Sequence, residues 1–274
     1  MLLGEKTENF LRRVAQAPLS ALLLDYDGTL APFSVDRDQA VPYDGVTDAL
    51  QKIVDAGRTR LVIVTGRNAY EIGPLLRLQP PPEVWGAHGL QRLRPDGSCE
   101  MPRIPGEVGQ ALDDARRWLI YQGLQDLAEI KPGSIAVHWR SVGETVASEV
   151  RFRVLLGWFP IAQRDALKLL EFDGGVEMRT ADLDKGDAVR TILAEVGPHV
   201  PVAYLGDDAT DERAFQALED QALRDRGLTV LVRPEPRRTA AEVWLRAPED
   251  LLEFLARWAR ATEPATKTLA APTR

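Results

Sequence analysis

The sequence has little of what marks secreted and membrane proteins. Cys99 is the only cysteine among 274 residues, so an intrachain disulfide is impossible, which is typical of a reducing compartment. No apolar run approaches the roughly 18 residues that a membrane span needs. The opening segment "MLLGEKTENFLRRVAQ" lacks the continuous apolar core of a signal peptide. We therefore expect a cytoplasmic protein without a membrane partner.

The sequence also lacks a basic stripe. The formal net charge is -7, and no cluster of lysine and arginine suggests nucleic acid as a partner. Overall acidity does not exclude a small anionic ligand, because the local charge decides its binding. With 45% hydrophobic residues, the chain can bury the core of one large domain or two modest ones. Nothing in the sequence specifies an oligomeric state, and a monomer is compatible with it.

Both ends of the chain alternate short apolar runs with segments of helical periodicity. We expect buried strands at 21–27, at 59–67 and around Val84, and further strands at 202–208 and 228–232, with helices between them. Strands that alternate with helices predict a parallel sheet covered by helices on both faces. The fold class is therefore predicted as α/β, with a Rossmann-like parallel sheet.

The middle of the chain has a different pattern. Residues 101–177 read as helix, two strands, helix and two strands, which indicates a small α+β unit. The α/β pattern resumes after it. The simplest organisation is a core made of residues 1–100 and 178–274, interrupted by an inserted cap at 101–177.

Three of the expected strands end in residues that carry chemistry. The first strand runs into "DYDGT" at 25–29, the second into "TGR" at 65–67, and a later one into "GDD" at 206–208, with Asp211 just beyond. Ligands of open parallel sheets lie at the carboxyl ends of the strands. Each motif alone is also typical of a surface turn, a helix cap or a loop. Their joint occurrence at buried strand ends predicts a site.

The predicted site contains several carboxylates. Asp25 and Asp27 share a face if the strand period of two persists. Converging carboxylates repel each other, and Mg²⁺ would resolve this because it takes oxygen ligands from a few carboxylates. Lys185 lies where a helix is expected to begin, and it could add a second positive charge.

These motifs resemble those of the haloacid dehalogenase-like (HAD-like) hydrolase superfamily. "DYDGT" resembles its first motif, Thr65 the second, Lys185 the third and "GDDATD" the fourth, and the insertion resembles a C2-type cap. Within the superfamily, the chain is similar to the trehalose-6-phosphate phosphatase family over roughly residues 20–260. The blocks that carry this similarity are "LLLDYDGTLAPF", "GAHGL", "KPGSIAVHWR", "VEMRTADLDKGDAV" and "GDDATDERAF".

The resemblance implies a Mg²⁺-dependent phosphatase that hydrolyses trehalose 6-phosphate. Asp25 would be the nucleophile that forms an aspartyl-phosphate, and Asp27 would protonate the sugar oxygen and then activate water. Thr65 and Lys185 would hold the phosphoryl oxygens. The metal site would be built from Asp25, Asp27 (through its backbone carbonyl), Asp207, Asp208 and Asp211.

Substrate recognition is expected from both parts of the chain. A small phosphorylated sugar offers many hydroxyl groups, so the cap should present polar side chains. The candidate substrate-binding residues are Thr65, Gly66 and Arg67 in the core and Glu129, Lys131, His138, Arg140 and Glu177 in the cap. For the cap residues, surface ion pairs are the alternative. His88 in "GAHG" receives no role.

Other functions are compatible with the same motifs. The substrate could be another sugar phosphate or a glycosyl-phosphoglycerate. A receiver-like signalling module also gathers acids, a threonine and a lysine, but its acceptor aspartate lies on a later strand and its chain is about half as long. A degenerate fold used only for binding is a third alternative, and the presence of all the expected catalytic residue types argues against it.

Overall fold

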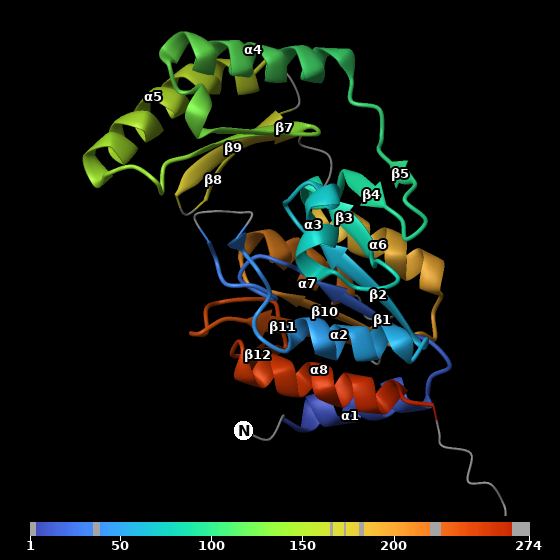
Figure 1. Cartoon of the computed structure of the whole chain (residues 1–274). Coiled ribbons are helices and arrows are strands. Elements are labelled where there is room, and N and C mark those ends of the chain that lie inside the picture. Colours follow the sequence, from blue (N-terminus) through green and yellow to red (C-terminus); the bar gives the residue numbers. More distant parts are fainter. Residues whose placement is uncertain are drawn as a thin grey trace, which may run out of the picture.

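The computed structural model describes residues 4–34, 39–164, 167–172, 174–180, 184–219 and 226–264. Its larger sheet has the strand order β12-β11-β10-β1-β2-β3-β4-β5 (Figure 1). Neighbours from β12 to β3 are parallel, while β4 and β5 add antiparallel strands. The strands are β1 Ser20–Leu24, β2 Thr59–Val64, β3 Glu83–Gly86, β4 Gln91–Leu93, β5 Cys99–Glu100, β10 Val202–Gly206, β11 Gly227–Val232 and β12 Val243–Leu245.

The central strand β1 is buried on both faces of the sheet. Leu22 and Leu24 belong to one hydrophobic cluster, whereas Ala21 and Leu23 belong to the other. This alternation follows from the period of two along a strand, and it explains the unbroken apolar run in the sequence. β1 is thereby held firmly at the centre of the molecule.

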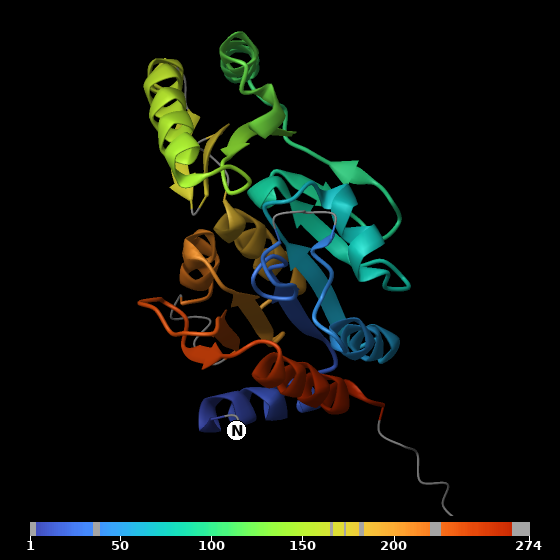
Figure 2. The same cartoon turned by 60° about the vertical axis from the view of Figure 1, so that its left-hand side comes forward.

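Helices cover both faces of this sheet, as expected (Figures 1 and 2). Those that contribute to the Leu22 cluster are α1 Glu5–Gln16, α2 Val46–Asp55, α3 Ala69–Leu76 and α8 Glu249–Thr262. Those that contribute to the Leu23 cluster are α6 Lys185–Val196 and α7 Glu212–Leu218. None of the helices in the described part of the chain is long and apolar enough to cross a membrane.

The inserted segment forms a second sheet with the order β6-β7-β9-β8. Its neighbouring strands are all antiparallel, and two helices cover one of its faces. The elements are α4 Gly106–Gln122, β6 Ala128–Lys131, β7 Ser134–His138, α5 Glu144–Ala162, β8 Leu167–Phe172 and β9 Gly175–Thr180. The opposite face of this sheet is turned toward the carboxyl ends of the core strands (Figures 1 and 2).

The sequence-based fold class is confirmed, with two differences in detail. The short edge strand β12 was not predicted, because three residues in a region without alternation give no period to detect. The expected end of the cap at residue 177 falls inside β9, which continues to Thr180 in the same sheet. The division of the chain into two domains stays a prediction.

Candidate active site

Asp25 lies at the carboxyl end of β1, between the ends of β10 and β2. Leu24 pairs with Leu205 on one side and with Ile63 on the other. The backbone N–H of Asp25 donates to the carbonyl of Leu205 at 2.9 Å. Because the strands are parallel, this register brings the residues that follow β1, β2 and β10 to one edge of the sheet.

The turn after Asp25 is shaped by a glycine. Gly28 has φ +82°, and a Cβ placed on it would lie 2.2 Å from Oδ2 of Asp207. No side chain fits there, so only glycine allows the first motif to approach Asp207 this closely. Tyr26 in the same turn is held in place by its buried hydroxyl, which donates a hydrogen bond to the carbonyl of Ala40 at 2.6 Å.

Lys185 joins the first motif to the fourth. It is 3% exposed, and its Nζ donates to Oδ1 of Asp25 and to Oδ1 of Asp211, both at 2.8 Å. Lys185 is the first residue of α6, and a capping box of Asp184 and Asp187 fixes this helix start. The ammonium group therefore has a defined position among the carboxylates.

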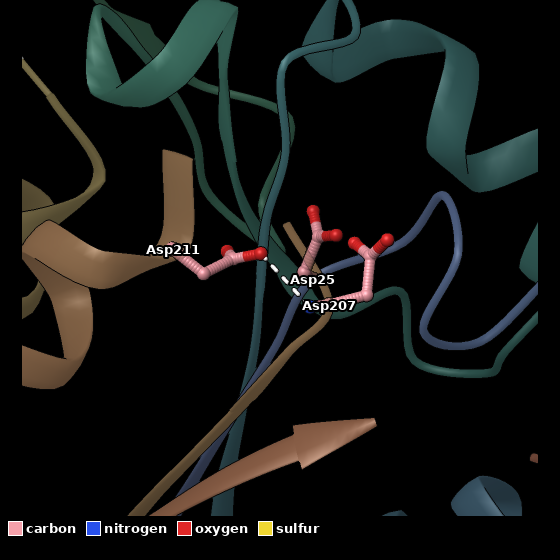
Figure 3. Close-up of side chains that lie close together, drawn as sticks. All are labelled: Asp25, Asp207 and Asp211. Atoms are coloured by element: carbon pink, nitrogen blue, oxygen red, sulfur yellow. Dashed lines mark hydrogen bonds between the residues drawn. The ribbon is translucent and has the colours of Figure 1, made fainter. Parts of the chain in front are cut away.

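Asp211 uses both oxygens to hold its surroundings. Oδ1 accepts from Lys185 and from the Tyr204 hydroxyl, the latter at 2.6 Å. Oδ2 accepts from the backbone N–H groups of Asp207 and Asp208 at 2.9 and 3.1 Å. Figure 3 shows the side chain reaching toward Asp207 in this way. This bonding indicates that Asp211 orients the loop after β10, whereas ligation of a metal by Asp211 stays a prediction.

The three buried carboxylates are suited to a cation. Asp25, Asp207 and Asp211 each offer an oxygen, and these oxygens lie within 4.8 Å of one another (Figure 3). Oδ1 of Asp207 is buried without a hydrogen-bond partner among the described residues. Lys185 supplies one positive charge against three carboxylates. A hard divalent cation would offset the remaining negative charge, so these residues fit Mg²⁺.

The pKa values follow from this crowding. Burial raises the pKa of Asp25 to about 8, although Lys185 acts to lower it and Asp211 to raise it further. Burial, followed by Asp25, also raises the pKa of Asp207 well above its usual range. Burial alone would also raise the pKa of Asp208, but Lys185 and Thr210 outweigh it and lower that pKa.

Asp27 points to a different partner from Asp25. Its two oxygens accept from Nη2 and Nε of Arg67 at 2.6 and 2.7 Å. Arg67 is 2% exposed, and its backbone N–H donates to the Thr65 hydroxyl at 3.1 Å. The second motif therefore holds the second carboxylate of the first motif. A contact of Arg67 or Thr65 with substrate stays a prediction.

Asp208 has a local partner as well. Its Oδ1 accepts from the backbone N–H and the hydroxyl of Thr210 at 2.8 and 2.6 Å, which caps the short helix η4 Ala209–Asp211. Ligation by Asp208, and by the backbone of Asp27, stays a prediction.

Two arginines that the sequence reasoning missed hold the loop after β10. Arg233 donates to the carbonyl of Asp207 at 3.2 Å, and Arg237 donates to the carbonyl of Asp208 at 2.6 Å. They follow β11, the neighbour of β10. The rule that ligands gather at the carboxyl ends of parallel strands could have drawn attention to "VRPEPRR", had it been applied to that strand.

Four of the predicted cap residues, Glu129, Lys131, His138 and Glu177, lie on one polar face of the β6-β7-β9 sheet. Lys131 and Glu177 lie 3.3 Å apart with side chains 7% exposed, and Ser134 donates to Glu177 at 2.8 Å. Glu129 lies 2.9 Å from His138. The alternative of surface ion pairs does not describe Lys131 and Glu177, because both side chains are largely shielded from solvent.

Arg140 lies at another point between the two parts of the chain. Its guanidinium carbon is 5.5 Å from the ring centre of Phe33, which follows the first motif. The structure therefore brings Arg140 near the loop that carries Asp25. Binding of substrate by any of the cap residues stays a prediction.

Comparisons with known proteins agree with this arrangement. The model of the trehalose-phosphatase family matches residues 23–248. Trehalose-phosphate phosphatases of Mycobacterium marinum and Mycobacterium tuberculosis are 30% and 32% identical over 258 and 264 residues, which cover 88% and 90% of this chain. The chain spans 62% of the length of each of these relatives.

Two solved structures show the same fold. The C-terminal domain of Candida albicans trehalose-6-phosphate phosphatase superposes with a TM-score of 0.78 at 19% identity, covering 95% of this chain and 98% of that one. A haloacid dehalogenase-like hydrolase from Bacillus subtilis gives 0.59 at 14% identity, covering 86% and 99%. The fold is thus that of the HAD-like hydrolases, and by its match over residues 23–248 this chain belongs to the trehalose-phosphatase family.

Proposed function

We propose that this protein is a Mg²⁺-dependent phosphatase that hydrolyses trehalose 6-phosphate to trehalose and phosphate, and that it acts in trehalose biosynthesis in the cytoplasm. The observation that carries the proposal is the buried carboxylate of Asp25. It lies at the end of β1, with Lys185 at 2.8 Å and the oxygens of Asp207 and Asp211 within 4.8 Å. The membership in the trehalose-phosphatase family supports the choice of reaction.

The geometry favours one oxygen of Asp25 as the nucleophile. Oδ1 accepts a hydrogen bond from Lys185 at 2.8 Å. Oδ2 has a longer and weaker one, at 3.5 Å, from the Thr29 hydroxyl. In the first step, Oδ2 forms a bond to phosphorus and the bond from phosphorus to the sugar oxygen breaks. Lys185 offsets the negative charge around the reacting group. The product of this step is an aspartyl-phosphate on Asp25.

Asp27 is suited to move protons in both steps. It gives a proton to the departing sugar oxygen and later takes one from the water that attacks the aspartyl-phosphate. Arg67 holds the Asp27 carboxyl group in place through hydrogen bonds to both of its oxygens, at 2.6 and 2.7 Å. The cycle restores both aspartates and consumes one water.

Mg²⁺ would be held by Asp25 and Asp207 and would add positive charge beside the phosphoryl oxygens. The unpartnered Oδ1 of Asp207 supports this assignment. The other contribution of Asp207 is its placement against Gly28, which fixes the distance between the two motifs.

The polar face of the inserted segment is suited to a sugar. The side chains of Lys131 and Glu177 are 7% exposed and lie on the face of the β6-β7-β9 sheet opposite its helices. That face of the sheet is turned toward the core (Figure 1), and charged groups on it can bind sugar hydroxyls. This supports a phosphorylated sugar as the substrate rather than a small phosphate ester alone.

The proposed substrate can be tested on a panel of phosphate esters. We expect Mg²⁺-dependent phosphate release from trehalose 6-phosphate with a kcat/KM at least about tenfold above that for glucose 6-phosphate, because two sugar rings can contact the polar face. A chelator should abolish the release, and Mg²⁺ should restore it. Equal rates for both esters, or faster release from another sugar phosphate or a glycosyl-phosphoglycerate, would contradict the substrate assignment.

A further inference from the structure

The segment after β3 holds an unusual backbone conformation beside the second motif. Ala87 and His88 have φ values of +48° and +57°, which residues other than glycine rarely adopt. Two backbone bonds maintain this conformation, from Ala87 N–H to the Arg67 carbonyl at 2.7 Å and from His88 N–H to the Thr65 carbonyl at 3.0 Å. Such conformations are strained, and they cluster at functional sites.

The same segment is wedged between the second and third motifs. A Cβ on Gly66 would lie 2.6 Å from Cε1 of His88, so the imidazole rests directly on the glycine of "TGR". A Cβ on Gly89 would lie 2.9 Å from the carbonyl of Asp184, the residue before Lys185. The loop of the second motif therefore limits the position of the His88 ring, and the residue before Lys185 limits the backbone at Gly89.

From this position His88 reaches the inserted segment. Its Nε2 lies 3.3 Å from Oε2 of Glu177 on β9. Glu177 also accepts from Ser134 and Lys131, so His88 completes a set of donors around one buried carboxylate. Burial alone would raise the pKa of Glu177, but His88 and Lys131 outweigh it and hold that pKa well below its usual range.

The chemistry of the pair fixes the state of the histidine. A carboxylate can only accept, so Nε2 of His88 carries the proton that Glu177 accepts. Burial lowers the pKa of His88, although Glu177 acts to raise it, and the lowered pKa favours the neutral ring. Nδ1 is then a bare acceptor, and it is buried without a partner among the described residues. A neutral donor is sufficient to orient Glu177.

We propose that His88 is a positioning residue that couples the loop of the second motif, residues 65–67, to the inserted segment. Its ring rests on Gly66 in the core and orients Glu177 above the Asp25 site. This inference rests on the proposed function, because orientation of Glu177 matters most for a substrate that carries a sugar. The coupling makes the protein select sugar phosphates over small phosphate esters.

The variant His88→Asn tests this coupling. Asparagine tolerates positive φ better than most residues, so the backbone conformation is retained while the reach to Glu177 is lost. We expect kcat/KM for trehalose 6-phosphate to fall about ten- to hundredfold, mainly through KM, and that for p-nitrophenyl phosphate to change less than about twofold. The matched control is His199→Asn, since His199 is exposed in the loop before β10 and should leave both values unchanged.

A double-mutant cycle with Glu177→Gln isolates the pair. If His88 acts through Glu177, adding His88→Asn to Glu177→Gln should cause little further loss for trehalose 6-phosphate. Fully additive losses would overturn the proposal. The cycle also keeps it testable if His88→Asn alone folds poorly, because Glu177→Gln should by itself produce the same selective loss.

Amide hydrogen exchange gives a readout that does not depend on the substrate. We expect His88→Asn to speed exchange in β9, residues Gly175–Thr180, and to leave β1 and β10 unchanged. Faster exchange in β9 without any activity on trehalose 6-phosphate in the wild-type protein would support the coupling and reject the proposed function. Unchanged exchange in β9, or equal losses with both esters, would overturn the inference.

Discussion

Asp25→Asn is expected to abolish Mg²⁺-dependent phosphate release from every phosphate ester, by at least about a thousandfold in kcat. The amide of asparagine is a poor nucleophile toward phosphorus and cannot form the aspartyl-phosphate. The substitution keeps the size of the side chain in the space beside Lys185 and Thr29. Release of inorganic phosphate from trehalose 6-phosphate and from p-nitrophenyl phosphate measures the effect.

The same variant should fold at least as well as the wild type in the absence of metal. Because the pKa of Asp25 is raised to about 8, the folded protein holds a proton there that the unfolded chain has released above about pH 4. The stability of the metal-free wild type therefore falls as pH rises from about 4 to about 8, and asparagine removes this contribution. Thermal unfolding of the metal-free wild type at several pH values shows whether its stability falls as pH rises.

Mg²⁺ should raise the melting temperature of the wild type and raise that of Asp25→Asn less, because a ligand stabilises only the state that binds it. An inactive variant that had also lost its fold would say nothing about the nucleophile, and the metal-free melting curves exclude that case. Activity close to the wild-type level would contradict the assignment of Asp25.

Lys185→Met is expected to cause the second large loss, at least about a hundredfold in kcat, and to destabilise the metal-free protein. Removing the ammonium group leaves Asp25 and Asp211 as buried carboxylates without their positive partner. Breaking a buried ion pair in this way costs about 3–5 kcal/mol. Chemical denaturation of the metal-free protein near pH 8 should show this decrease in the free energy of unfolding.

The pH dependence separates this explanation from a simple loss of packing. At lower pH the carboxylates beside position 185 take up protons, so the destabilisation by Lys185→Met should shrink between about pH 8 and pH 5. Lys52→Met on the exposed side of α2 is the matched control and should be near neutral. A destabilisation that does not depend on pH would contradict the electrostatic explanation.

The sequence was sufficient to predict the fold class and the convergence of motifs. The consecutive leucines of β1 predict a strand that is buried on both faces, and turn residues follow directly after Leu24. Since parallel strands end at one edge, the positions of Asp25, Thr65 and Asp207 at that edge follow from the order of the elements.

The pairing of side chains could not be predicted, because it depends on distances between loops. Nothing in the spacing of the residues indicates that Arg67 donates hydrogen bonds to Asp27. Nor does it indicate that both oxygens of Asp211 accept hydrogen bonds, from Lys185, Tyr204 and the backbone. His88 was missed for a related reason. A histidine in the left-handed region leaves no trace in composition or periodicity, and the contact with Glu177 joins residues on different sheets.

The central claim is that Asp25 carries the phosphoryl group during turnover, and the variant Asp27→Asn tests it most directly. p-Nitrophenolate leaves without protonation, so the first step should proceed in this variant, whereas hydrolysis of the aspartyl-phosphate should stall without its base. We expect acid quenching of Asp27→Asn with labelled p-nitrophenyl phosphate to leave one phosphoryl group on the peptide that contains Asp25, and Asp25→Asn in the same background to leave none. Label on any other residue, or label that survives the Asp25→Asn substitution, would contradict the account.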